Sequence, residues 1–244
     1  MNEFFLWLTV ITTAIIAGTI GGVVGFGSGV LLLPVCAYVF GAREAVPLLT
    51  VASLLGNLSR AYFSWKEIDW RVVMYFVIGA VPFSALGAYV FVQIDAALLE
   101  CLLGVFLISL VIFRRLLGQG VFRVQLMHFP FIGAVMGFLS GVVATTGPIN
   151  APFFLYFGLV KGAYLSTEAL STMSMHIVKS LVYGKYAVLN ITILVKGIAV
   201  GTAMSVGSYL GKRVINKMTT KTFFLVVEVL LLVAGVLMII QSSH

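Results

Sequence analysis

Apolar runs of about twenty residues follow one another along almost the whole chain, and this feature constrains the fold more than any other. Hydrophobic residues make up 61% of the 244 positions and charged residues only 9%, far more apolar side chain than a soluble core needs. Backbone polar groups inside a bilayer must be satisfied within the segment itself, so such runs predict helices. The sequence therefore predicts an all-α polytopic membrane protein, with the lipid bilayer as its surroundings and little mass outside it.

The apolar runs form two sets that repeat each other. The runs are 4–24, 28–40, 45–64, 71–92 and 96–113, followed by 126–144, 147–158, 165–184, 190–211 and 221–240. Asn57 and Arg60 in the first set match His176 and Lys179 in the second at one constant offset along the chain. This duplication predicts two membrane repeats, residues 1–122 and 123–244, that together form one integrated transport domain.

The second run of each set is too short to cross a membrane. Residues 28–40 reach about 20 Å as a helix, against a hydrocarbon core of about 30 Å. Each short run follows a break rich in small residues, Gly25 to Gly29 in the first half and Ala144 to Pro148 in the second. Irregular backbone at membrane depth survives only where it is buried in protein or lines a cavity. We therefore expect the first two runs of each half to form a broken-helix hairpin, or two tilted helices that meet at the midplane, followed by three spanning helices.

The positions of the basic residues support the hairpin. If each hairpin enters and leaves on one side, most Lys and Arg residues face the cytoplasm, and Arg43, Lys185 and Lys196 face the outside. If each pair of runs were instead one broken span, the two sides would carry nearly equal numbers. The positive-inside rule favours the hairpin, which places both termini outside and makes the halves inverted repeats. The net charge of +7 is then a topology signal, and no nucleic-acid partner is expected.

Inverted repeats with interrupted helices are typical of secondary transporters, which hold their substrate at the interface between the repeats. Here the N-termini of two short helices point into the protein, and free N–H groups at such ends favour an anion. The predicted substrate-binding residues at these ends are Gly27, Ser28, Gly29, Thr145, Thr146, Gly147 and Asn150. The alternative for the glycines is close helix packing, which is the favoured explanation for Gly18, Gly21 and Gly22.

Arg60 and Lys179 place a positive charge inside otherwise apolar helices. Such a charge costs about 2.5–3.5 kcal/mol on insertion scales, and its simplest use is to hold an anion. Asn57 and His176, one turn earlier, would orient that anion. Arg60 lies about one turn from the end of its run and could instead extend to the cytoplasmic surface. Lys179 is deeper, and the sequence favours it over Arg60.

Three further polar residues stand in apolar runs. His176 and Glu228 are candidates for proton coupling, with a hydrogen-bonded core histidine and a cation-paired carboxylate as the respective alternatives. Glu168 lies near the start of the run 165–184, where a carboxylate complements the helix dipole, so we expect a structural role for it. Motifs of enzymes and metal sites are absent from the sequence, and no catalytic residue, cofactor or metal is expected.

Residues Gly22 to Pro34 follow the pattern G-x-x-G-x-G-x-G-x-L-x-x-P, and Gly147 to Pro152 follow G-P-x-x-x-P. With the duplicated layout, these segments resemble the TauE/SafE sulfite exporter family, also described as a toluenesulfonate-uptake permease family. The resemblance covers essentially the whole chain. It implies transport of sulfite, sulfonates or related small organosulfur anions, coupled to protons. The second half departs from the pattern at Ala144-Thr145-Thr146, where more small residues are expected.

The sequence as a whole predicts a secondary transporter of a small sulfur oxyanion or organosulfur anion, working by alternating access in a bacterial inner membrane. Its expected partners are the anion and protons, and a homodimer is left open. A passive anion channel and a non-transporting membrane subunit are the alternatives.

Overall fold

The computed structural model describes residues 3–25, 28–117 and 123–214, together with residues 232, 236, 239 and 240. Every regular element in these ranges is a helix, as the apolar runs predict. The α-helices are α1 (Glu3–Val24), α2 (Ser28–Phe40), α3 (Ala42–Phe63), α4 (Trp70–Gln93), α5 (Ala96–Leu117), α6 (Phe129–Val143), α7 (Gly147–Phe157), α8 (Lys161–Lys185) and α9 (Ile191–Val214). Two 3₁₀ turns, η1 (Trp65–Glu67) and η2 (Leu126–His128), precede α4 and α6. The last predicted run, 221–240, lies outside the described residues apart from four positions.

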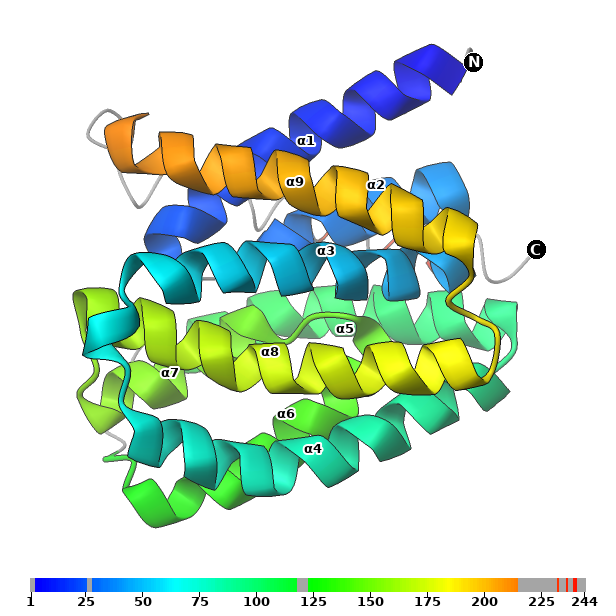
Figure 1. Ribbon diagram of the computed structural model, residues 1–244. Helices are drawn as coiled ribbons and strands as arrows, with labels where there is room; N and C mark the ends of the chain where they lie inside the picture. The colour runs from blue at the N-terminus through cyan, green and yellow to red at the C-terminus, as the bar shows by residue number, and fades with distance from the viewer. Residues whose placement is uncertain are drawn as a thin grey trace.

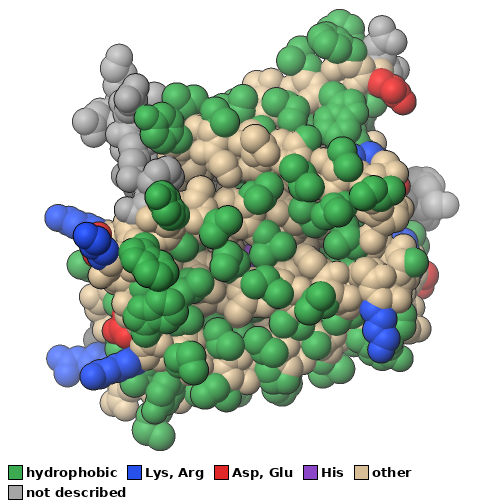
Figure 2. Space-filling model, in the orientation of Figure 1, with side chains coloured by type: hydrophobic (Ala, Val, Ile, Leu, Met, Phe, Trp, Pro, Cys, Tyr) green, Lys and Arg blue, Asp and Glu red, His purple; other side chains and the backbone are tan. Residues whose placement is uncertain are grey.

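The helices have the lengths and surfaces of a multi-pass membrane protein. Four stretches of the described chain are long and apolar enough to span a bilayer: Glu3–Gly22, Trp70–Gln93, Leu126–Val143 and Ile191–Leu210. Figure 2 shows hydrophobic side chains over most of one face, with Lys and Arg near the edges where helices end. Helices α3 and α8 are as long but more polar, and they lie side by side in the middle of the molecule (Figure 1). Their polar residues therefore face protein rather than lipid.

Short polar caps set where several helices begin. The Asp69 carboxylate accepts hydrogen bonds from the backbone N–H groups of Arg71 and Val72, at 3.0 and 3.3 Å, and starts α4. Asn190 Oδ1 accepts one from Ile193 N at 2.9 Å and starts α9. Such caps satisfy N–H groups that have no partner within the helix. The chain can therefore turn sharply at the membrane surface and place consecutive helices next to each other.

Each half begins with a long and a short helix joined at the predicted break. Helix α2 turns back toward the end of the molecule from which α1 came, so the two form a hairpin (Figure 1). The hairpin is tight, since a Cβ at Gly21 would lie 2.8 Å from Ser28 Oγ. Helices α6 and α7 repeat this arrangement across the break at 144–146. Both breaks are thus held inside the helical bundle, where irregular backbone can line a cavity.

The two halves interlock rather than stand apart. Helix α1 packs along α9 and α6 along α4, so the first helix of each half lies on the fourth helix of the other. Matched helices also run in opposite directions, α3 against α8 and α4 against α9 (Figure 1). Opposite direction is what an inverted repeat requires. The observed pairing leaves α3 and α8, the most polar long helices, at the centre of both halves.

Glycines allow this close packing. A Cβ at Gly79 on α4 would collide with the backbone of Pro130 and Ala134 on α6, and one at Gly133 would collide with Phe76 on α4. On α1, a Cβ at Gly18 would likewise collide with the backbone of Met204 on α9, and one at Gly22 with that of Ser208. The packing explanation given above for Gly18 and Gly22 is therefore confirmed. Small residues at crossings are how membrane helices maximise contact in the absence of a hydrophobic driving force.

Substituting Gly79 by alanine should lower stability, because the added methyl group must push α4 and α6 apart. Overpacking of this kind typically costs about 1–3 kcal/mol. Gly184→Ala is a matched control, since a Cβ there meets nothing within 4 Å. Thermal unfolding of the purified variants, followed by intrinsic fluorescence, should show a lower midpoint for G79A and an unchanged or raised midpoint for G184A. Equal midpoints would show that the α4–α6 crossing does not depend on Gly79.

Candidate functional site

A cavity of about 30 Å³ lies where the two helix breaks approach α3 and α8. It brings together eight of the predicted substrate-binding residues, Ser28, Gly29, Asn57, Arg60, Thr145, Thr146, Gly147 and His176. Other residues around it that the sequence did not single out for binding include Ser53, Ser140, Glu168, Thr172 and Met175. A Cβ at Gly29 would lie 3.0 Å from Thr145 Oγ1, so the two breaks meet at this point. The cavity is thus shared by both halves of the chain.

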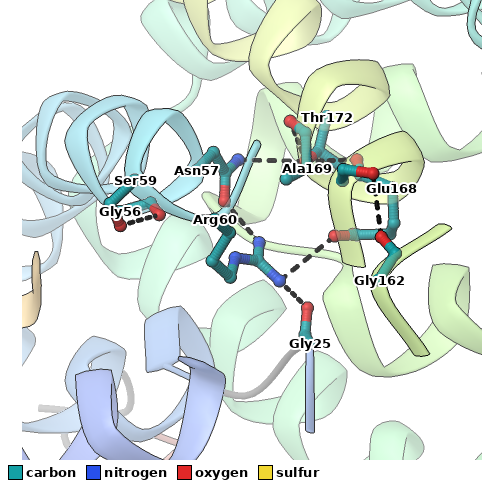
Figure 3. A network of polar contacts seen from close by, with 10 residues as sticks. Gly25, Gly56, Asn57, Ser59, Arg60, Gly162, Glu168, Ala169 and Thr172 are labelled. Carbon is teal, nitrogen blue, oxygen red and sulfur yellow. Dashed lines mark hydrogen bonds and ion pairs between the residues drawn. The ribbon is translucent and has the colours of Figure 1, made fainter. Parts of the chain in front are cut away.

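Arg60 is the cation that faces the cavity. Its side chain is only 9% exposed and forms an ion pair with Glu168 on α8, with 3.3 Å between Nη1 and Oε2. The same guanidinium donates to the Gly25 carbonyl at the end of α1 and to Asn57 Oδ1 (Figure 3). The alternative in which Arg60 extends to the cytoplasmic surface is therefore wrong. Its inward direction follows from the packing of α3 on α8, which supplies the carboxylate.

Lys179 is fully buried and bound to the end of α6. Its ammonium group donates to Ser140 O at 3.0 Å, Ser140 Oγ at 2.8 Å and Ala144 O at 2.9 Å. An ammonium group has three N–H donors, so all of them are used. Lys179 is not among the residues that line the cavity. Its predicted contact with the anion stays a prediction, but the geometry favours Arg60 over Lys179, the reverse of the preference stated above.

The two cations make the same contact in their own halves. Arg60 binds the carbonyl of Gly25 and Lys179 that of Ala144, and Gly25 and Ala144 match at the same offset as the cations. Both carbonyls stand at a helix break with positive φ, 84° and 72°. Each cation therefore stabilises the C-terminal end of a broken helix, where a positive charge complements the dipole. The repeat thus extends from the sequence to the hydrogen bonds.

The two halves differ in the residues beside each cation, and these differences separate the roles of the cations. Ser140 beside Lys179 matches Gly21 in the first half, which has no side chain to accept a hydrogen bond. Arg60 is thereby free to reach Asn57 and, across the interface, Glu168. The result is one cation bound within its own half and one that joins the two halves.

Matched polar residues from both halves line the cavity between the cations. Ser53 and Asn57 on α3 correspond to Thr172 and His176 on α8. Asn57 Nδ2 donates to Thr172 Oγ1 at 2.9 Å, which links α3 to α8 (Figure 3). The imidazole of His176 is 5% exposed, and its Nδ1 has no hydrogen-bond partner among the described residues. The site is therefore built around the contact of the two central helices.

Buried polar groups gather at the N-terminus of α7. Thr146 Oγ1 is buried and finds no hydrogen-bond partner in the described part of the chain, and the buried Asn150 amide has the Glu168 carboxylate as its neighbouring partner. A buried polar group without a partner is destabilising by about 1–3 kcal/mol, so such groups indicate a place where a ligand or water binds. Together with the N–H of Gly147 at the start of α7 and the Arg60 guanidinium, they form a set of polar groups suited to an oxyanion.

Comparison with known proteins identifies the family of this chain. The family model described as "Sulfite exporter TauE/SafE" matches residues 10–238. The chain belongs to the TauE/SafE family. It is 22% identical to the "Probable membrane transporter protein YunE" of Bacillus subtilis, over 97% of this chain and 98% of that protein. It is 28% identical to the "Probable membrane transporter protein MJ0441" of Methanocaldococcus jannaschii, over 60% of this chain and 61% of that one. No solved structure matches the chain.

Membership of the TauE/SafE family makes the protein a membrane transporter and not an enzyme, as the sequence predicts. Within the described residues, no group of three or more His, Cys, Asp or Glu side chains is arranged to hold a metal ion. Gly27 and Glu228, predicted as substrate-binding and proton-coupling residues, lie outside the described residues.

Glu168 is the residue of this TauE/SafE transporter whose role the sequence reasoning missed. The apolar run 165–184 placed it in the first turn of a helix, but α8 begins at Lys161, so Glu168 lies beyond that turn. It is 1% exposed and pairs with Arg60, which contradicts the expected helix-dipole role. A carboxylate inside a membrane helix needs a partner, but this signal was hidden because the start of the helix was placed at residue 165.

Proposed function

We propose that this TauE/SafE protein is a secondary transporter that holds a small sulfur oxyanion or organosulfur anion at Arg60, in a bacterial inner membrane. The observation that carries the proposal is the cavity between the halves. It combines the Arg60 guanidinium, two helix N-termini and the unpartnered hydroxyl of Thr146, and the Asn150 amide lies in the first turn of α7. A planar guanidinium binds the oxygens of sulfite or a sulfonate through two parallel hydrogen bonds.

The size of the cavity favours a small substrate. About 30 Å³ offers room for about two water molecules, because each water needs about 10–15 Å³. A cavity this small favours compact anions such as sulfite, thiosulfate or methanesulfonate over an aromatic sulfonate. The names of the two relatives do not specify a substrate. The substrate class therefore rests on the family description and on the chemistry of the cavity.

Alternating access is supported by the way the halves are built. Matched helices run in opposite directions and matched residues surround one cavity, which is the arrangement of transporters that rock around a central site. Proton coupling requires a titratable group that faces the anion. His176 meets this requirement by lining the cavity, and Glu228 remains the second candidate from the sequence.

Counterflow in proteoliposomes tests the proposal. Purified protein is first screened by thermal shift against sulfite, thiosulfate, methanesulfonate and acetate, and we expect stabilisation by the sulfur anions. Preloading vesicles with the anion that stabilises most should then accelerate uptake of its labelled form several-fold, because a carrier returns faster when loaded. A response to acetate alone would overturn the substrate class. Uptake that does not depend on preloading would indicate the passive channel instead.

A further inference from the structure

Glu168 occupies the place beside Arg60 that a bound anion would need. Its Oε2 atom lies 3.3 Å from Arg60 Nη1, and the Asn150 side chain on α7 is a second hydrogen-bonding neighbour of the same carboxylate. Arg60 and Glu168 both line the cavity, and the carboxylate side chain is 2% exposed. Two further donors of the guanidinium bind the Gly25 carbonyl and Asn57 Oδ1 (Figure 3). An entering anion therefore competes with the carboxylate for the same positive charge.

The charges around the cavity determine whether an anion can bind at Arg60 while Glu168 is ionised. Arg60 on α3 and Glu168 on α8 face each other, and the other titratable groups nearby are His176 on the cavity wall and Tyr164, which lies beside Gly25. The parts of α2, α6 and α7 at the cavity contribute hydroxyl and backbone groups, and Lys179 points away to the end of α6. With Glu168 ionised, the Arg60 charge is already neutralised. A second anion would then share one guanidinium with a carboxylate in a poorly solvated site, where like charges repel strongly.

We propose that Glu168 is the proton-coupling group of this transporter, and that it takes up one proton as the anion takes its place at Arg60. The proton comes from water on the side from which the anion enters, binds the Glu168 carboxylate and gives a neutral carboxylic acid. Release of the anion reverses the step, so the carboxylate loses the proton to water and pairs with Arg60 again. This inference rests on the proposed function, and it assigns to Glu168 the role for which the sequence suggested His176 and Glu228.

Anion binding and proton binding at this site should strengthen each other. If binding of one anion draws in one proton, binding of the proton strengthens binding of the anion by the same factor. Affinity should therefore rise about tenfold for each unit by which pH falls, until Glu168 is already protonated in the empty protein. Glutamine has the shape of the protonated acid and no charge, so Glu168→Gln should remove this dependence and bind more tightly than the wild type at high pH.

Thiosulfate is a suitable probe because its charge does not change between about pH 5.5 and 8.5, so any slope belongs to the protein. Binding of labelled thiosulfate to the purified full-length chain should be measured across this range for the wild type, E168Q and His176→Asn. We expect a slope close to tenfold per unit in the wild type and in H176N, and a flat profile in E168Q. At about pH 8, E168Q should bind at least tenfold more tightly than the wild type.

Proton uptake by the wild type gives a second measurement that needs no variant. Thiosulfate is added to the protein in weak buffer that contains a pH dye. The rise in pH should correspond to the uptake of close to one proton for each anion bound. Binding without proton uptake, or an unchanged slope in E168Q, would overturn the role of Glu168 while leaving the anion site intact. Loss of the slope in H176N alone would assign coupling to His176. No binding of thiosulfate, sulfite or methanesulfonate by the wild type would instead refute the proposed function, and this inference with it.

Discussion

Substituting Arg60 by glutamine should abolish saturable uptake of the transported anion in proteoliposomes, with a loss of at least about 100-fold in affinity. The guanidinium is the cation facing the cavity, and hydrogen bonds to charged groups contribute about 1.5–3 kcal/mol each. Two such bonds to the anion would account for a loss of this size. Lys66→Gln is a matched control, because Lys66 lies just beyond the same helix, carries the same charge and is exposed. It should transport like the wild type.

A double variant separates binding from folding in this test. R60Q leaves the Glu168 carboxylate buried without its partner, which typically costs about 3–5 kcal/mol. Adding Glu168→Gln removes the unpaired charge, so R60Q/E168Q should recover most of the thermal stability and still fail to bind the anion. If the double variant recovers both stability and uptake, Arg60 is a structural residue and the anion binds elsewhere.

Substituting Lys179 by glutamine should lower stability by about 3 kcal/mol or more and reduce uptake only as far as folding is lost. Its ammonium group satisfies the Ser140 and Ala144 carbonyls, and glutamine cannot make all three hydrogen bonds. Lys185→Gln on the same helix removes an exposed charge and should change neither property. Thermal unfolding and uptake should be measured on the same preparations. A K179Q protein with a normal midpoint and no uptake would place Lys179 in the anion site, as the sequence reasoning expected.

These two experiments distinguish residues that the repeat makes equivalent. Arg60 and Lys179 match in position and in contact with a helix break, so any argument from the duplication treats them alike. Their different expected phenotypes follow from Ser140, which engages Lys179, and from Gly21, which cannot engage Arg60. This asymmetry leaves Arg60 at the interface between the halves, where its partner Glu168 comes from the other half.

Much of the fold could be predicted from local features of the chain. The bounds of α2, α4 and α9 lie within a few residues of the predicted runs, because apolar length and polar caps are properties of neighbouring residues. The two breaks were located by their glycine, threonine and proline content, and they open onto the cavity. The start of α8 was placed too late because Lys161 to Tyr164 do not belong to an apolar run, and that error hid the depth of Glu168.

By itself the sequence determined that this chain is a helical membrane protein of two similar halves, with paired interruptions and a matched cation in each. These are local or periodic properties, and they do not depend on how the helices pack. Only the tertiary structure decided which cation faces the cavity and which one holds α6. The ion pair of Arg60 with Glu168 joins residues far apart in the chain, and it forms because α3 and α8 lie against each other. Side-chain direction within a buried helix depends on such neighbours, and repeat position alone does not specify it.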